Sequence, residues 1–172
     1  MPDTKLSGMG HQVPLEEQTR ERSQHPYEGP EGARRARRIE RPVAVVGASA
    51  DRAKFGNKAV RAYTDEGYTV WPVNPRSGEI EGQSVYADVR DLPSLPFIAS
   101  IYLHEDAAIE VLEALADMER EAGDSIAVVY LNPGADQPRV IARAEDLGLY
   151  AISTCSIRAI GRAPEEFGAE GA

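Results

Sequence analysis

The sequence predicts an α/β protein in which a doubly wound parallel sheet lies between two layers of helices, a three-layer α/β/α arrangement. Between residues 43 and 153, short runs of β-branched and other apolar residues alternate with longer segments of helical periodicity. Helical segments of this length serve as right-handed crossovers between parallel strands. The first apolar run ends at a glycine followed by small residues, which is typical of the turn at the open edge of such a sheet.

The expected elements follow one another in regular order. The expected strands are residues 43–46, 69–73, 97–103, 126–131 and 149–153. The expected helices are residues 56–66, residues 105–121, and a helix that opens at Asp136 or Gln137 with Pro138 in its first turn. Each helix ends at a glycine, namely Gly67, Gly123 or Gly148. Between the second and third strands we expect a hairpin-like excursion over residues 79–86 and a short helix or turn over 88–92.

The two ends of the chain differ from this middle part. Residues 1–38 contain few large apolar side chains and several Pro and Gly residues, so they cannot bury enough surface to offset the entropy of ordering. We expect a flexible N-terminal tail there, whose basic cluster Arg34–Arg38 is more often a solvated segment than a contact for RNA or an acidic partner. Residues 39–162 are expected to form the folded domain, and residues 163–172 a flexible C-terminal tail.

Composition and charge argue against several classes of protein. The formal net charge is −9 and the sequence pI is about 4.9, which argues against general nucleic-acid binding. No stretch reaches the roughly 20 apolar residues that a membrane span needs, and the first thirty residues have no apolar core of a secretory signal. The single cysteine, Cys155, cannot form an internal disulfide, so we expect a cytoplasmic protein.

The turn after the first predicted strand is the candidate anion site. There the strand Val43–Val46 runs into Gly47-Ala48-Ser49, and backbone N–H groups in such a turn commonly bind phosphate. The dinucleotide fingerprint Gly-x-Gly-x-x-Gly is incomplete, because Ser49 stands at its second glycine. Ser49 has a second interpretation as a helix N-cap, and Lys54 in the following loop as a solvated charge.

The end of the second predicted strand argues against NAD. Many NAD-binding folds place Asp or Glu there to accept from the ribose hydroxyl, but this chain has Val73-Asn74-Pro75. Arg76 follows directly, and a guanidinium favours a 2′- or 3′-phosphate on the ribose. The fixed φ of proline makes this loop a rigid wall suited to a flat adenine ring.

Together, these segments resemble the Rossmann-type CoA-binding domain. The resemblance covers roughly residues 42–158 and is most specific in the Gly-Ala-Ser and Pro-Val-Asn-Pro segments, about 25 residues apart. The family includes small stand-alone bacterial and archaeal proteins, the first domain of ADP-forming acyl-CoA synthetases and the succinyl-CoA synthetase α-subunit. The resemblance implies a Rossmann-like fold and coenzyme A or acyl-CoA as the ligand.

The resemblance also implies a set of binding residues. It implies that the CoA pyrophosphate is held by the backbone N–H groups of Gly47, Ala48 and Ser49 and by the Ser49 hydroxyl. It also implies that Lys54 places a charge on a phosphate, with Phe55 and Gly56 at the N-terminus of the following helix. At the adenine and its 3′-phosphate it implies Val73, Asn74, Pro75 and Arg76, with His104 lining the same groove. Cys155 has two interpretations, a mixed disulfide with the CoA thiol and, more simply, a small buried hydrophobe.

No catalytic residue is assigned from the sequence. The synthetases act through further domains that carry a phosphorylated histidine and a nucleotide-binding module, and 172 residues leave no room for either. At the fifth strand many stand-alone members have Trp-x-Gln where this chain has Tyr130-Leu131-Asn132, so no contact with the pantetheine or acyl end is assigned there. A metal site near His104 would need a second histidine. The other two, His11 and His25, lie in the expected tail, so no metal is expected.

Two other functions stay open at this point. One is an NAD(P)-dependent oxidoreductase, which would need an acid–base group such as Tyr-x-x-x-Lys, and no such pair follows the fourth strand. The other is a regulatory subunit of an acyl-CoA ligase, with the arginine-rich tail docking the partner. A homo-oligomer or an acyl-CoA-metabolising partner protein is compatible with each of them.

Overall fold

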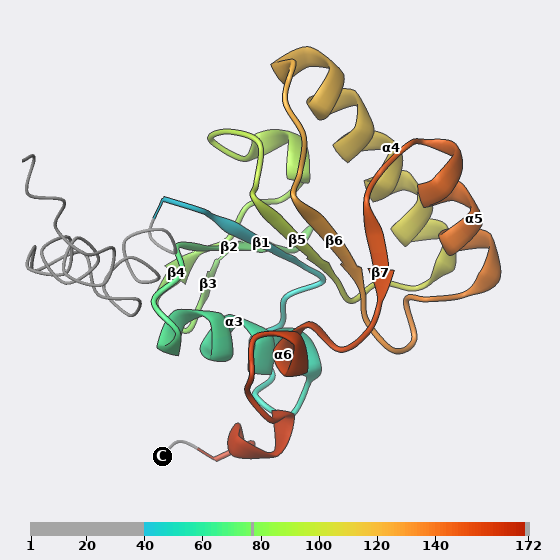
Figure 1. Cartoon of the computed structure of the whole chain (residues 1–172). Helices are drawn as coiled ribbons and strands as arrows, with labels where there is room; N and C mark the ends of the chain where they lie inside the picture. Colours follow the sequence, from blue (N-terminus) through green and yellow to red (C-terminus); the bar gives the residue numbers. More distant parts are fainter. Residues whose placement is uncertain (1–39, 77, 171–172) are drawn as a thin grey trace, which may run out of the picture. The chain divides into compact units, whose positions relative to one another are not determined.

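The structure is a computed structural model that describes residues 40–76 and 78–170 (Figure 1). Its central element is a five-stranded parallel sheet with the strand order β2-β1-β5-β6-β7. The strands are β1 (Val43–Val46), β2 (Val70–Val73), β5 (Ile98–Ile101), β6 (Val128–Leu131) and β7 (Ala151–Ser153). The expected N-terminal tail and its arginine cluster lie outside the described residues.

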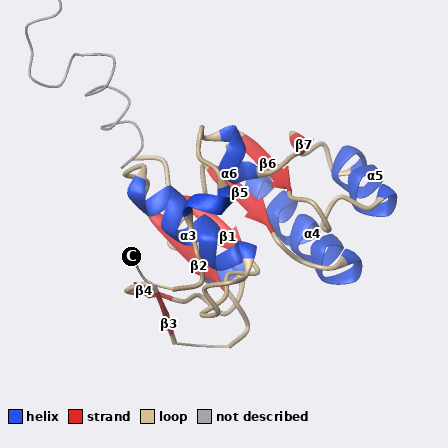
Figure 2. Cartoon of the chain, turned by 90° about the horizontal axis from the view of Figure 1, so that it is seen from below, coloured by secondary structure: helices blue, strands red, loops and turns tan. Residues whose placement is uncertain are grey.

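Helices cover both faces of the sheet. They are α3 (Phe55–Asp65), α4 (Glu105–Ala122), α5 (Pro138–Asp146) and the short α6 (Ser156–Ala159). Figures 1 and 2 show α3 and α6 on one face and α4 and α5 on the other. This three-layer arrangement confirms the predicted fold class. No helix in the described part of the chain is both long and apolar enough to span a membrane.

The two faces are built by alternation along the strands. Val43 and Val45 of β1 pack into the core under α3 and α6, whereas Ala44 and Val46 pack into the core under α4 and α5. Because both faces are covered, β1 is apolar throughout rather than alternating with polar residues. On α4, the fully buried Leu112 and Leu115 lie on the stripe that the sequence predicts.

The connection from β2 to β5 contains no α-helix. It consists of the hairpin β3 (Glu79–Ile80) and β4 (Gln83–Ser84) and the 3₁₀ turn Val89–Asp91, as the sequence predicts. This connection carries the chain past β1, which therefore lies between β2 and β5. The direction of winding reverses at β1, and ligands of open α/β sheets bind beyond the carboxyl ends of the strands at such a reversal.

The C-terminal segment differs from its prediction. After α6, residues Pro164–Glu166 form a 3₁₀ turn, and Phe167 is only 5% exposed in the core cluster that contains α3. The Phe167 ring lies 5.0 Å from the Arg162 guanidinium and 5.6 Å from that of Arg61 on α3. A flexible tail over 163–172 is therefore wrong for residues 163–170, because one aromatic side chain anchors a segment whose average composition is polar and small.

Candidate functional site

Two cavities lie at the edge where the winding reverses. The smaller, of about 200 Å³, is lined by Gly47, Lys54, Phe55, Gly56, Tyr102, Leu103, His104, Pro133, Gly134 and Ala135. The larger, of about 330 Å³, is lined by Ser49, Ala50, Asp51, Lys54, Asn74, Arg76, Gly78, Glu79, Ile80 and Val85. Lys54 lines both cavities. Of the predicted binding residues, only Ala48, Val73 and Pro75 line neither.

The glycine turn is tight because three chain segments meet there. Gly47 has a φ of +87°, and a Cβ at this position would lie 2.5 Å from the carbonyl oxygen of Tyr102, which follows β5. The N–H groups of Gly47 and Ala48 both donate to the Val73 carbonyl at the end of β2, at 3.0 and 3.2 Å. The prediction that these two N–H groups donate to a phosphate therefore needs correction, since β2 already occupies them.

The unused donors lie one step further along the chain. Within residues 40–76 and 78–170, no hydrogen-bond acceptor is seen for the N–H groups of Ser49, Ala50, Phe55 and Gly56. The last two belong to the first turn of α3, where N–H groups lack intrahelical partners and the helix dipole favours an anion. Ala50 is a donor that sequence reasoning missed, because no motif position marks it.

Ser49 is not the N-cap of α3, because that position belongs to Lys54, whose side chain makes no capping bond. The Ser49 Oγ instead accepts from the N–H of Asp51 at 3.1 Å, which shapes the loop. An oxygen that accepts in this way still has its own proton to donate, so the hydroxyl can bind an anion.

Gly56 lets α3 approach the turn. A Cβ at Gly56 would lie 2.3 Å from the Gly47 carbonyl oxygen, well inside any permitted contact. Close helix–strand packing is the task of the third glycine in the dinucleotide fingerprint, and here Gly56 performs it nine positions after Gly47. The neighbouring Phe55 side chain is 54% exposed, with the Lys58 ammonium 5.2 Å from its ring centroid.

The loop after β2 is tied to the loop after β1. The Asn74 Nδ2 donates to the Ala48 carbonyl at 2.7 Å, and its Oδ1 accepts from the Arg76 N–H at 2.8 Å. Asn74 therefore joins the two loops, and it also lines the larger cavity. The remaining amide hydrogen and lone pair are still available, and a place for Asn74 beside an adenine stays a prediction. The Arg76 side chain is exposed and has no ion pair in the described part of the chain. Ile80 and Val85 add an apolar wall that sequence reasoning missed.

His104 lies at the mouth of the smaller cavity as the N-cap residue of α4, and its exposed side chain makes no capping bond. The neighbouring Glu105 pairs with Arg139 rather than with His104. Burial raises the pKa of Tyr102, in the same cavity, to about 12, and its hydroxyl lies 3.1 Å from the Ser156 Oγ. The described residues thus pair His104 with no acid or base.

A buried polar network lies beneath this edge. The Asn132 Nδ2 donates to the Ser100 Oγ and the Ile101 carbonyl, both at 3.0 Å, and its Oδ1 accepts from the Ser156 N–H at 2.8 Å. The Ser100 and Ser156 hydroxyls are 2.7 Å apart. The network joins the ends of β5 and β6 to α6, and Asn132 therefore has a structural role that its place in the Tyr130–Gly134 segment did not reveal.

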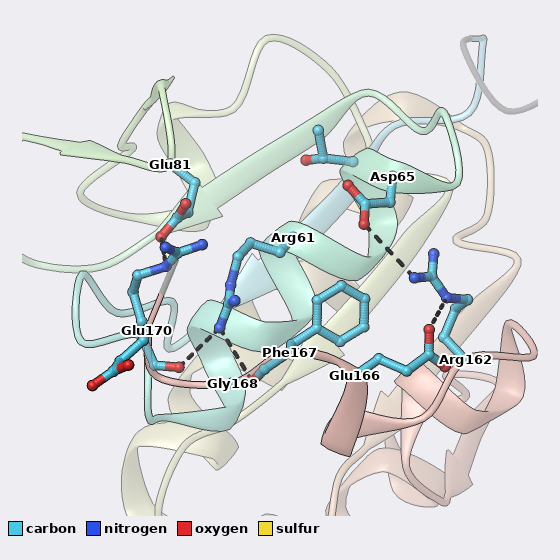
Figure 3. Close-up of a pocket in the computed structure, with 10 residues that line it drawn as sticks. Arg61, Asp65, Glu81, Arg162, Glu166, Phe167, Gly168 and Glu170 are labelled. Carbon is cyan, nitrogen blue, oxygen red and sulfur yellow. Dashed lines mark hydrogen bonds and ion pairs between the residues drawn. The ribbon is translucent and has the colours of Figure 1, made fainter. Parts of the chain in front are cut away.

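A third cavity, of about 430 Å³, lies beside α3 and the C-terminal segment (Figure 3). It is lined by Arg52, Arg61, Thr64, Asp65, Glu81, Arg162, Glu166, Phe167, Gly168 and Glu170. Arginines and carboxylates mix on its walls, and two of its arginines are ion-paired within it. We do not assign it to the phosphorylated ligand, because the strand ends and the unpaired N–H groups do not contribute to it. In the described part of the chain, no cluster of His, Cys, Asp and Glu could hold a metal ion.

The strand order, the three layers and the glycine turn at the winding reversal together define a Rossmann-like domain. The model of the CoA binding domain family matches residues 41–160. The chain belongs to this family, as the sequence resemblance implied, and membership supports CoA as the ligand. No curated protein matches the chain.

Solved structures share this fold. A conserved hypothetical protein from Pyrococcus furiosus is 30% identical, with a match covering 69% of this chain and 98% of that one at a TM-score of 0.58. A protein from Thermus thermophilus, 21% identical over 75% of this chain and 92% of its own, shares the fold with a TM-score of 0.62.

A larger enzyme contains a similar unit. The apo dinucleotide forming acetyl-coenzyme A synthetase 1 of Ca. Korarchaeum cryptofilum is 26% identical over 66% of this chain, with a TM-score of 0.51. The match covers only 26% of that synthetase. This chain is therefore similar to about a quarter of the enzyme.

Proposed function

We propose that this domain binds coenzyme A or an acyl-CoA, without catalysing a reaction, across the two cavities at the edge where the winding reverses. The single observation that carries the proposal is the position of Lys54, which lines both cavities next to the unpaired N–H groups of the glycine turn and the α3 N-terminus. A pyrophosphate joins the two halves of CoA, and this junction offers a cation and backbone donors between two compartments.

The two compartments suit the two ends of the ligand. The larger holds the adenosine end, with Ile80 and Val85 against the base and Arg76 near the 3′-phosphate. The smaller takes the pantetheine arm, with Tyr102 and His104 at its wall. Volumes of about 330 and 200 Å³ together fall within the roughly 300–1,000 Å³ common for small-molecule sites.

The absence of catalysis is part of the proposal. Nucleophilic or acid–base chemistry needs a reactive group within hydrogen-bond reach of an activating partner. At this edge the Ser49 Oγ contacts the Asp51 N–H, and the described residues give His104 no such partner. A cytoplasmic location, a homo-oligomer and an acyl-CoA-metabolising partner stay predictions.

A thermal-shift titration with CoA, dephospho-CoA, acetyl-CoA, NAD and NADP tests the proposal. A ligand at a hundred times its Kd adds about 2.7 kcal/mol of stability, which shifts the melting temperature clearly. We expect stabilisation by CoA and acetyl-CoA. Stabilisation by NAD or NADP alone would overturn the proposal and return the oxidoreductase alternative.

Replacing Arg76 with alanine separates the 3′-phosphate from the rest of the ligand. A charge-assisted hydrogen bond contributes about 1.5–3 kcal/mol, so we expect the Kd for CoA to rise at least tenfold. The Kd for dephospho-CoA, which lacks this phosphate, should not change. The matched control is Arg90→Ala, whose guanidinium pairs with Asp88 on the surface. If Arg76→Ala lost affinity equally for CoA and dephospho-CoA, the result would contradict the role given to Arg76.

A further inference from the structure

Asn57 lies on the first turn of α3 and connects, from behind, the two walls of the cavity of about 330 Å³, the larger of the two at the strand ends. Its side chain is fully buried, and its Nδ2 donates to the Ser49 carbonyl at 2.9 Å and to the Glu81 Oε1 at 3.0 Å. Its Oδ1 accepts from the Arg61 Nε at 2.8 Å. Since both Nδ2 partners only accept and the Arg61 Nε only donates, the orientation of the amide is fixed. One side chain thus joins three segments: the loop from Gly47 to Lys54 after β1, here called the phosphate loop, the β3–β4 hairpin and the next turn of α3.

Glu81 occupies a backbone position that disfavours it. It is the first of the two central residues of the β3–β4 turn, followed by Gly82, and both have a positive φ, of 49° and 76°. Glu81 is the one residue other than glycine with a positive φ in the described part of the chain. Turns of this geometry prefer Asn-Gly. The Glu81 carboxylate, however, binds Asn57 and pairs with the Arg52 Nε at 3.1 Å, contacts that a shorter side chain cannot reach.

Arg61 extends the connection to the C-terminal segment (Figure 3). Its Nη2 donates to the Arg52 carbonyl at 2.9 Å and to the Phe167 carbonyl at 3.4 Å. The described residues place no carboxylate in ion-pair contact with Arg61, so all its hydrogen-bond acceptors are neutral. Burial, followed by the charge of Arg52, lowers the pKa of the Arg61 guanidinium. An arginine in this position is explained by its fork of donors, which holds Asn57, the phosphate loop and Phe167 at once.

We infer that Asn57, Glu81 and Arg61 are positioning residues that set the distance between the phosphate loop and the hairpin, and so tune the affinity for the nucleotide end of the ligand. The inference rests on the proposed function. None of the three side chains lines the larger cavity, whose walls include Ser49 on one side and Glu79 and Ile80 on the other. Because Arg61 donates to the Phe167 carbonyl, the segment around Phe167 belongs to the same hydrogen-bonded group.

Glu81→Asn tests the inference most sharply, because it improves the turn while removing the contacts. We expect the melting temperature to change by less than about 3 °C, since the favoured Asn-Gly turn offsets the lost bonds. The Kd for CoA, and for adenosine 3′,5′-bisphosphate as a probe of the nucleotide end, should rise about tenfold. A purely structural role predicts the opposite pattern, a lower melting temperature with unchanged affinity per folded molecule.

Two further variants keep the test decisive if Glu81→Asn folds poorly. Arg61→Lys keeps the charge and the helix propensity but loses the fork, and Phe167→Ala removes a side chain that lines neither cavity at the strand ends. Both should weaken CoA binding several-fold. Glu165→Asn is the control, because Glu165 pairs with the exposed Arg158 on the same segment. Unchanged CoA affinity in Glu81→Asn, Arg61→Lys and Phe167→Ala would overturn the inference and leave the proposed function standing. A wild-type protein that does not bind CoA would instead remove both the inference and the proposed function.

Discussion

Replacing Gly56 with alanine is expected to destabilise the fold by about 3 kcal/mol, at the upper end of the cost of overpacking. The added Cβ would lie 2.3 Å from the Gly47 carbonyl oxygen. This neighbour is backbone, so no change of rotamer relieves the clash, and α3 must move away from the turn. The unpaired N–H groups of Phe55 and Gly56 move with it, so CoA affinity should also fall.

The sign of this effect distinguishes packing from helix propensity. Alanine is favoured over glycine inside a helix by about 1 kcal/mol, so local propensity alone predicts that the variant is more stable. Urea unfolding of wild type, Gly56→Ala and Gly168→Ala measures the difference. A Cβ at Gly168 would meet no atom within 4 Å, and the φ of this residue is not positive, so its variant should stay within about 0.5 kcal/mol of wild type. A Gly56→Ala protein as stable as wild type would refute the close-packing role.

Replacing Asn132 with alanine is expected to destabilise the fold by about 3 kcal/mol. The buried Ser156 N–H loses its acceptor, which costs about 1–3 kcal/mol, and the removed amide leaves a cavity that adds to this loss. The Ile101 carbonyl and the Ser100 hydroxyl also lose a donor. The ends of β5, β6 and α6 should therefore loosen together.

A double-mutant cycle with Ser100→Ala checks whether these groups act as one network. Contacting polar residues couple by about 0.5–3 kcal/mol, so the double variant should lose less stability than the two single losses combined. Ser153→Ala, at an exposed position on β7, serves as the control and should change stability by less than about 0.5 kcal/mol. Strict additivity would show that Asn132 and Ser100 contribute independently.

Much of the fold followed from local pattern. The apolar runs predicted all five strands of the parallel sheet, and the three- and four-residue spacing with terminal glycines predicted α3, α4 and α5. The first predicted strand has the bounds of β1, but later ones were too long: 97–103 was predicted for Ile98–Ile101, and 126–131 for Val128–Leu131. Apolar residues that flank a strand are buried against other elements without joining its ladder, and periodicity does not distinguish these cases.

The site was only partly predictable for a related reason. Motif spacing identified the two loops and Lys54, and the structure brings these to one edge. Motif spacing did not show that the Val73 carbonyl of β2 accepts from the N–H groups of Gly47 and Ala48, nor that Asn74 joins the two loops. Such facts depend on which backbone group another strand presents, and a single segment contains no information about its neighbour.

By itself, the sequence determined the class of fold, because this depends on local periodicity and terminal glycines, and its motifs resembled the family to which the chain belongs. The tertiary structure alone decided which N–H groups stay unpaired, that Gly56 rather than a fingerprint glycine permits the close approach, and that Phe167 anchors the C-terminal segment on α3. Each of these results requires segments distant in the chain to meet, as Asn57, Glu81 and Arg61 do behind the larger cavity. Contacts of this kind arise from packing, and packing is settled only when the whole domain folds.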